Sequence, residues 1–224
     1  MRSSARRSSG RPTKEQAAAL DDRVLDGARA AFCRNGIANS SVDQLAQDLG
    51  VSKHTIYRRY RNKEALLDAV VHRDVLRFRE ALVTAGAETA DPLASLEAIA
   101  RRYFEIGSSR EYAAFYLSLI AESALSIDLR GRLSAWARLS LEPLLRAVGD
   151  VHRAGFGGGS PPAVLSETLI DLLEGACNSI RLHDDSHGLH ADPQSAFAQR
   201  WAAYLVILDA CAADQETRTG VSDG

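Results

Sequence analysis

The 224-residue sequence lacks the features of membrane proteins and of secreted proteins held together by disulfides. No apolar run approaches the roughly 18 residues that a membrane span needs, and residues 1–15 lack the apolar centre of a secretory signal. The only cysteines, Cys33, Cys177 and Cys211, lie far apart and without CxxC spacing. We therefore expect a cytoplasmic protein with no membrane partner. Its cysteines are interpreted as buried reduced thiols, with a redox sensor as the alternative.

Patterns of catalytic or metal-ligating residues are also scarce. One cluster of histidines and aspartates could bind a metal, but it falls in an irregular stretch, and its spacing matches no zinc or nucleophile motif. We interpret this stretch as a solvated polar loop, with metal binding as the alternative. We expect no catalytic residue, no metal and no cofactor, so the protein is predicted not to be an enzyme. The cluster consists of His183, Asp184, Asp185, His187, His190 and Asp192.

Charge is distributed unevenly along the chain. Residues 1–67 contain 13 Lys/Arg and 7 Asp/Glu, whereas residues 68–224 contain 14 and 22. The first third therefore has a formal net charge of +6, and the remainder has −8. Because only the basic part attracts polyanions, a nucleic-acid surface is expected to be confined to the N-terminal third.

Residues 1–18 have no apolar period and are rich in Ser, Arg and Gly, which predicts a disordered basic arm. Gly10-Arg11-Pro12 within it partly matches an AT-hook, in which an extended Arg-Pro enters a narrow minor groove. Three interpretations of the arm stay open: added nonspecific DNA affinity, minor-groove reading and an inert tail.

Beyond the arm, apolar residues recur at helical spacing and no strand is convincing. Capping residues and glycines set the predicted ends of the helices. Pro143 is expected to bend one helix, a loop is predicted at 155–162, and a disordered tail at 215–224. The predicted helices are 21–36, 41–50, a short one from 52, 62–85, 91–107, 111–125, 127–154, 161–182 and 192–213. This is an all-α fold of about nine helices, with a three-helix domain at 19–67 and a helical domain at 68–214.

Residues 41–60 have the pattern of a helix-turn-helix. Ala46 is small where the second helix must approach the first, and Gly50 lies in the turn, where a positive φ is needed. Ile56 is expected to anchor the next helix to the core. Basic and hydroxyl residues then lie on the outward face of that helix, which could enter the major groove of DNA.

This pattern resembles the TetR family of bacterial transcriptional regulators, nearly position for position over residues 23–71. The rest of the chain resembles the family only in the number and size of its helices. Arg59 and Tyr60 stand where the family frequently has His and Phe. The matching residues are Ala28, Phe32, Gly36, Ser41-Val42, Leu45-Ala46, Gly50-Val51-Ser52, Thr55-Ile56-Tyr57 and Asn62-Lys63-Glu64-Ala65-Leu66.

The resemblance implies a double-stranded DNA operator as partner. It implies base readers at the start of the recognition helix, phosphate contacts after it, and a helix N-terminus at Ser41 facing a phosphate. Arg58 and Arg61 either touch the backbone or solvate the surface, and Tyr60 is expected to pack in the core. The implied base readers are Lys53, His54 and Thr55, and the implied phosphate contacts are Ser41, Tyr57, Arg59 and Lys63, with Arg58 as a further candidate.

Helices 161–182 and 192–213 are apolar on more than one face, which favours burial between copies, with burial within one subunit as the alternative. In the resembling family these helices form a four-helix bundle in a homodimer, and the helices before them enclose a small-molecule effector. The aromatic stripe there has plain core packing as its alternative. The candidate effector contacts are Tyr103, Phe104, Tyr112, Phe115, Tyr116, Leu119, Glu122, Trp136, Leu172 and Asn178.

The sequence therefore predicts a bacterial cytoplasmic regulator, associated with the nucleoid when bound to DNA. Repression of a pseudo-palindromic operator, relieved by a small hydrophobic or aromatic effector, is the mode that the resemblance implies. The alternative is an architectural or activating DNA-binding protein that has no effector.

Overall fold

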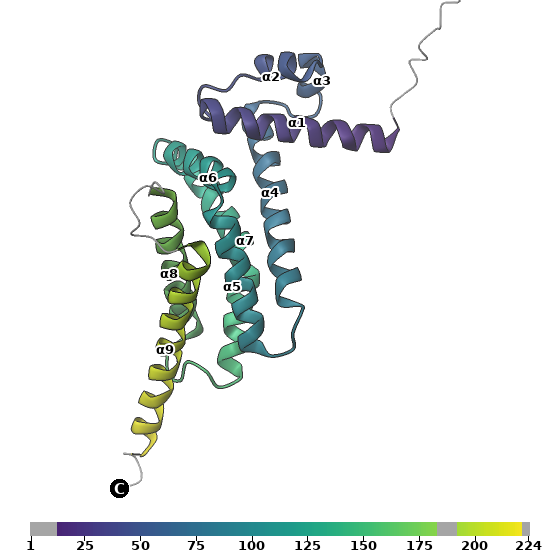
Figure 1. Ribbon diagram of the computed structural model, residues 1–224. Helices are drawn as coiled ribbons and strands as arrows, with labels where there is room; N and C mark the ends of the chain where they lie inside the picture. Colours follow the sequence, from purple (N-terminus) through teal and green to yellow (C-terminus); the bar gives the residue numbers. More distant parts are fainter. Residues whose placement is uncertain (1–12, 183–191, 221–224) are drawn as a thin grey trace, which may run out of the picture. The chain divides into compact units, whose positions relative to one another are not determined.

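The computed structural model describes residues 13–182 and 192–220, with side chains up to Cys211 (Figure 1). Two compact units divide the chain, Met1–Val71 and His72–Gly224. In the described ranges all regular structure is helical, in nine helices labelled α1 to α9, which confirms the predicted all-α fold. The predicted boundary between the two domains at residue 67 stays a prediction.

The first unit consists of α1 (Lys14–Asn35), α2 (Val42–Leu49), α3 (Lys53–Tyr57) and the start of α4 (Lys63–Gly86). These helices bury one apolar face each, at the spacing that the sequence shows. A Cβ at Gly27 would lie 3.0 Å from the Leu49 side chain, which shows how closely α1 approaches α2. The core of the unit is formed by Val24, Leu25, Ala28, Ala31, Phe32, Ile37, Val42, Leu45, Ala46, Ile56, Leu66, Leu67, Val70 and Val71.

The start of α1 differs from the prediction, because the helix begins at Lys14, within the predicted arm. Thr13 Oγ1 accepts a hydrogen bond from the Gln16 N–H (3.2 Å), and the Gln16 side chain accepts one from the Thr13 N–H (3.1 Å). This reciprocal cap stabilises a first turn that has no apolar period, since it is exposed. The predicted disordered arm is therefore wrong from residue 14 onward, and residues 1–12 lie outside the described part.

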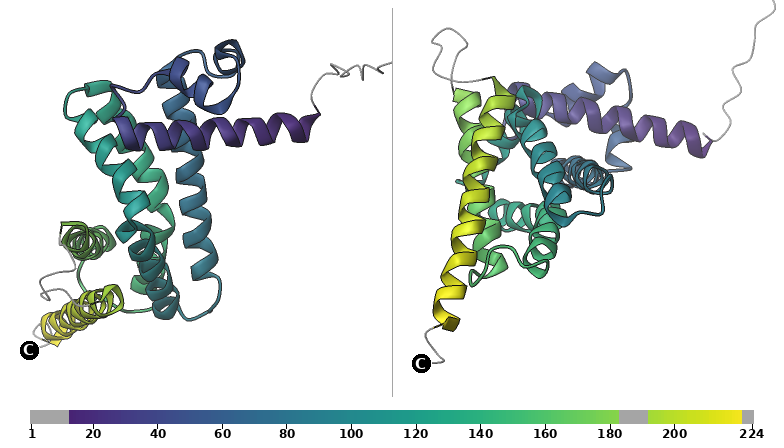
Figure 2. Two further views of the ribbon diagram at one scale, coloured as in Figure 1. Left: turned by 45° about the horizontal axis from the view of Figure 1, so that its top comes forward. Right: turned by 60° about the horizontal axis from the view of Figure 1, so that its bottom comes forward.

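The second unit contains the rest of α4 and α5 (Pro92–Ser108), α6 (Arg110–Ser123), α7 (Ile127–Arg153), α8 (Pro162–Leu182) and α9 (Pro193–Gly220). Helix α5 packs against α6, α7, α8 and α9, and α8 lies beside α9 (Figure 2). The shared core includes Phe104, Leu144, Leu169, Leu173 and Phe197, all at most 2% exposed.

Helix α9 continues to Gly220, so the predicted disordered tail is wrong for residues 215–220. The stretch 211–219 contains no proline or glycine, the residues that most strongly end a helix. A helix end placed from apolar periodicity alone falls too early there, because the period stops before the helix does.

Replacing Gly50 with Ala is expected to lower the free energy of unfolding by about 1 kcal/mol, because L residues are strained in the left-handed region. Gly50 has φ 64° and ψ 31°, and a Cβ there would meet nothing within 4 Å, so backbone strain is the only cost. Gly131→Ala is the matched control, since Gly131 is an exposed glycine inside α7. That substitution should stabilise by up to about 1 kcal/mol. Urea unfolding followed by circular dichroism measures both changes, and shifts of the same sign would contradict the assigned turn.

Candidate nucleic-acid interface and effector site

The turn between α2 and α3 is built around Gly50. The Gly50 N–H bonds to the Ala46 and Gln47 carbonyls, and the Val51 N–H bonds to the Ala46 carbonyl at 3.0 Å. These bonds close the end of α2, while the left-handed backbone of Gly50 redirects the chain. The direction of α3 is therefore fixed within a few residues of the end of α2.

Helix α3 has only five residues, so local contacts must hold it in place. Ser52 caps it: its Oγ accepts from the Thr55 N–H at 3.2 Å and lies 2.8 Å from Thr55 Oγ1. Ile56 is fully buried and anchors the helix, as predicted, whereas Tyr57 is 44% exposed. One side chain thus fixes α3 to the core and leaves its opposite face open.

The predicted base readers stand at the start of α3 and differ in exposure. Lys53 and His54 are exposed and Thr55 is partly buried beside Ser52. Arg58, directly after α3, is exposed as well. These side chains therefore lie near one another on α3 and directly after it, and their contacts with bases stay predictions.

Two of the predicted phosphate contacts have protein partners in this structure. Arg59 Nε donates to Asp21 of α1, and the Arg59 side chain is only 18% exposed. Lys63 Nζ donates to the carbonyls of Ile37 (2.9 Å) and Ala38 (2.7 Å). Both cations thus hold the loop and helices that present α3, and phosphate contacts by them stay predictions.

Ser41 caps α2, its Oγ accepting from the N–H groups of Asp43 (3.2 Å) and Gln44 (3.4 Å). Two residues that sequence reasoning missed also belong to this region. Arg23 of α1 donates to the Leu49 carbonyl at 3.2 Å, and Asp43 lies 3.4 Å from Lys53 Nζ. The sequence pattern of α1 and α2 did not predict these two contacts, because each depends on how the helices cross.

In the second unit, aromatic rings from α4, α5 and α6 form a chain that we name the tyrosine cluster: Phe78, Tyr103, Tyr112 and Tyr116. Phe78 contacts Tyr103 edge to face (5.6 Å between centroids) and stacks on Tyr112 at 5.9 Å. Tyr112 stacks in turn on Tyr116 at 5.8 Å. Three of the predicted effector contacts therefore lie next to one another.

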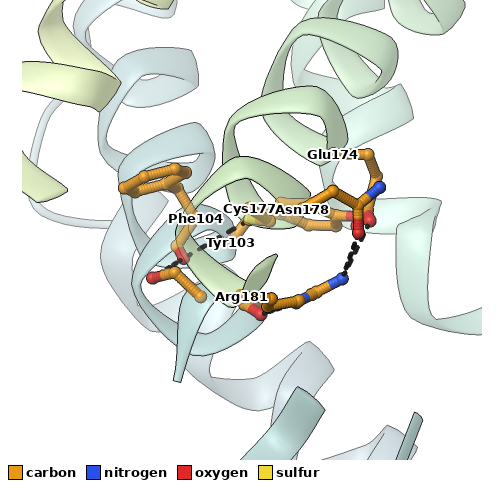
Figure 3. A network of polar contacts seen from close by, with 8 residues as sticks. Tyr103, Phe104, Glu174, Cys177, Asn178 and Arg181 are labelled. Carbon is orange, nitrogen blue, oxygen red and sulfur yellow. Dashed lines mark hydrogen bonds and ion pairs between the residues drawn. The ribbon is translucent and has the colours of Figure 1, made fainter. Parts of the chain in front are cut away.

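A polar network lies against this cluster (Figure 3). Tyr103 Oη donates to Glu174 of α8 at 2.5 Å, and Arg181 lies 3.5 Å from the same carboxylate. Arg181 Nη1 also donates to Asn178 Oδ1 at 3.0 Å, and its Nε donates to the Gly107 carbonyl at 3.0 Å. Glu174 and Arg181 were missed, although a spacing of seven places both on one face of α8.

Other predicted effector contacts lie elsewhere in the second unit. Phe104 packs on Phe197 of α9 at 5.8 Å and is 2% exposed, which matches the alternative of core packing. Trp136 lies under Arg132 of its own helix, at 5.8 Å. Phe115 and Leu119 are buried on α6, whereas Glu122 and Leu172 are half-buried. The compact part of the candidate site is therefore the tyrosine cluster with Glu174, Asn178 and Arg181.

Burial raises the pKa of each phenol in this site. Burial, followed by the neighbouring Glu174, raises the pKa of Tyr103 well above its usual value. Burial also raises the pKa of Tyr112 and Tyr116, and Arg181 partly offsets this. A phenol with its ordinary pKa is already protonated at physiological pH, so these shifts keep the three groups neutral hydrogen-bond donors and acceptors into more alkaline solution.

Comparison with known proteins gives the DNA-binding unit a family. Residues 24–70 match the model of the bacterial regulatory proteins of the tetR family. The uncharacterized HTH-type transcriptional regulator Rv1255c of Mycobacterium tuberculosis is 32% identical over 71 residues, 32% of this chain and 35% of that protein. This match thus spans about a third of the length of the relative. UidR, an HTH-type transcriptional regulator of Escherichia coli K12, is 25% identical over 167 residues, 72% of this chain and 82% of UidR.

Solved structures share the fold across most of the chain. FadR of Bacillus subtilis, solved with stearoyl-CoA, has a TM-score of 0.71 at 17% identity, covering 83% of this chain and 98% of FadR. A TetR family transcription regulator from Marinobacter aquaeolei has a TM-score of 0.64 at 19% identity, covering 85% and 98%. Residues 24–70 thus match the tetR family, and most of the chain shares the fold of these solved structures. The predicted resemblance is confirmed, and these relatives are named as regulators, not as enzymes.

Outside these two sites, the described residues offer little further chemistry. Cys177 is buried 3.9 Å from the Phe104 carbonyl, and burial, with Glu174 nearby, raises the pKa of its thiol to about 12. A thiol of this kind is unreactive, which does not favour a redox sensor there. The described residues hold no group of three or more His, Cys, Asp or Glu placed to bind a metal, and no described helix is long and apolar enough to cross a membrane. Most of the predicted metal loop, residues 183–191, lies outside the described part.

Two single-charge substitutions separate the supporting lysine from the exposed one. Lys63→Met should lower the free energy of unfolding of the first unit by about 1 to 2 kcal/mol, because two carbonyls lose a charged donor. Lys53→Met should change it by less than about 0.5 kcal/mol, since that side chain is 66% exposed. Urea unfolding and DNA binding are measured for both. Equal stability losses would contradict the division of roles, and so would undiminished DNA binding by Lys53→Met.

Proposed function

We propose that this protein is a ligand-responsive regulator of transcription that binds a pseudo-palindromic DNA operator as a homodimer. The observation that carries the proposal is α3, anchored by fully buried Ile56 and exposing Lys53, His54 and Tyr57. The major groove admits a single helix, and a short cationic helix presented this way can reach base edges with its N-terminal side chains.

Lys53, His54 and Thr55 are proposed as the residues that read bases. Lysine suits the acceptors of guanine, and the methyl group of threonine suits that of thymine. Tyr57 and Arg58 are proposed to contact phosphates, together with the capped N-terminus at Ser41. Arg59 and Lys63 are proposed to contribute through the shape of the unit, and to contact phosphates only by exchanging their protein partners.

The homodimer is proposed to form through α8 and α9. Val164 of α8 is 49% exposed and Val206 of α9 is 68% exposed, although both helices bury their other face in the core. Small exposed residues, Gly175 on α8 and Ala202 and Ala203 on α9, would let two helix pairs approach closely. Two-fold symmetry then sets two recognition helices about one DNA turn apart, roughly 34 to 36 Å.

The effector is proposed to be a small, largely hydrophobic or aromatic molecule bound near the tyrosine cluster. FadR binds stearoyl-CoA, so an acyl thioester is one class to test. Aromatic faces and neutral phenols suit an apolar ligand with few polar groups. Arg181 already uses most of its N–H donors in contacts with Gly107, Asn178 and Glu174, so it has few left for a polar ligand.

Repression is proposed as the mode of action, with the effector favouring a state in which the recognition helices are wrongly spaced for DNA. A differential affinity of about 2 to 3 kcal/mol would weaken operator binding by roughly 30- to 150-fold. Helix α4 contributes residues to both units, and Arg79 on it is tied to Glu142 of α7 at 2.6 Å. Movement of α7 would therefore act on α4.

The alternative is an architectural or activating DNA-binding protein without an effector. In either case the protein acts in the bacterial cytoplasm, on the nucleoid.

Val206→Glu is expected to convert the dimer to a monomer, because it puts a charge in the middle of the proposed interface. Tight operator binding should be lost with it, since each half-site alone is held weakly. Val83→Glu on α4 is the matched control, because Val83 is 54% exposed on a helix outside that interface. Sedimentation velocity measures the assembly, and a dimeric Val206→Glu protein would contradict it.

A panel of acyl thioesters and small aromatic compounds should raise the melting temperature of the wild-type protein for at least one class, because a ligand that binds only the folded state stabilises it. Tyr112→Phe keeps the ring and removes the hydroxyl, whereas Tyr112→Ala removes the stacking contacts. The shift should survive in the first variant and vanish in the second. No shift with any class would favour the alternative without an effector.

A further inference from the structure

An ion pair joins α2 to α3 on the proposed DNA surface. The Asp43 carboxylate, in the first turn of α2, lies 3.4 Å from the ammonium of Lys53, the first residue of α3. The two side chains are 54% and 66% exposed, so water and salt compete with the contact and it adds little to stability. Its main consequence therefore concerns what Lys53 can bind.

We propose that Asp43 is a specificity-determining residue of the DNA interface. Its carboxylate holds the Lys53 ammonium beside the start of α2, so that Lys53 contributes more to operator binding than to the binding of arbitrary duplex DNA. This inference rests on the proposed DNA-binding function. Asp43 acts through Lys53 and is a positioning residue rather than a base reader.

The physical reason is that an unrestrained lysine does not discriminate between DNA sequences. Its ammonium is a point charge on a flexible stem and binds any phosphate in reach. Phosphate contacts carry no sequence information, and they supply nearly all of nonspecific affinity. A carboxylate partner competes with phosphates for the ammonium. On the operator, a base acceptor held at the right place replaces that carboxylate and restores the contact.

Both ends of the pair are fixed by neighbouring caps. Ser41 Oγ accepts from the Asp43 N–H at 3.2 Å, which sets the backbone of Asp43. Ser52 and Thr55 close the start of α3, with their hydroxyl oxygens 2.8 Å apart. The pair spans the Gly50 turn and joins the first turn of α2 to the start of α3.

The same helix offers a matched control. Asp48 is also exposed, but its carboxylate accepts from the Gln44 amide at 2.9 Å. Asp43→Asn and Asp48→Asn therefore remove the same charge from the same helix, and only the first releases Lys53.

The experiment begins with selection of operator DNA from a random pool by the wild-type protein. Affinities for that operator and for a random-sequence duplex of equal length are then measured by fluorescence anisotropy at several salt concentrations. Asp43→Asn should tighten binding of the random duplex by about threefold to fivefold and that of the operator by less than about twofold. The salt dependence of random-duplex binding should become steeper, as expected when a lysine gains a phosphate.

Two further variants make the result decisive. Asp48→Asn should change both affinities by the same factor. Lys53→Gln should lower the affinity for the operator more than the affinity for the random duplex. In the Lys53→Gln background, Asp43→Asn should leave the ratio of the two affinities unchanged. Circular dichroism checks that each variant is folded. If Asp43→Asn does not fold, Lys53→Gln still tests the ion pair, because it removes the other partner.

The inference is overturned if Asp43→Asn and Asp48→Asn shift the ratio equally, or if the effect of Asp43→Asn persists without Lys53. A wild-type protein that binds no duplex at low salt would instead overturn the proposed DNA-binding function. The failure of one is thus distinguishable from the failure of the other.

Discussion

The burial of Ile56 is the contact on which the proposed DNA-binding surface depends. Helix α3 is only five residues long, far too short to be stable by itself. Because Ile56 is fully buried, the orientation of α3 is fixed, and Lys53, His54 and Tyr57 are exposed. The Gly50 turn and the Ser52 cap fix the remaining freedom of the helix. A single apolar side chain thus decides which residues of a short basic segment are available to a partner.

Charge around that anchor is arranged more tightly than composition suggests. Arg59 and Lys63 are turned inward onto Asp21 and onto backbone carbonyls, where they stabilise the support of α3. Lys53, His54 and Arg58 remain exposed. The positive charge of the N-terminal third therefore serves two purposes: part of it holds the unit together and part of it faces solvent. The second unit uses its charges differently, since Glu174 and Arg181 tie α8 to Tyr103 and to the end of α5.

Most of the fold could be predicted because apolar period and caps are local properties. Ser41, Gly50 and Ser52 mark helix ends in the sequence and do so in the structure. The start of α1 and the end of α9 were missed, since an exposed helical turn has no apolar period. The inward contacts of Arg59 and Lys63 could not be predicted either, because they depend on how α1, α3 and α4 cross. The same holds for Glu174, because the partners of a half-buried acid cannot be predicted until the packing of the opposite helix is known.

The central claim is that two copies of α3 lie in successive major grooves of one DNA duplex. Selection of bound sequences from a random pool by the purified protein tests it most directly. The account predicts an inverted repeat whose half-site centres lie about 10 base pairs, or a multiple of that spacing, apart. A single unrepeated motif, a direct repeat or no enriched motif at all would contradict it.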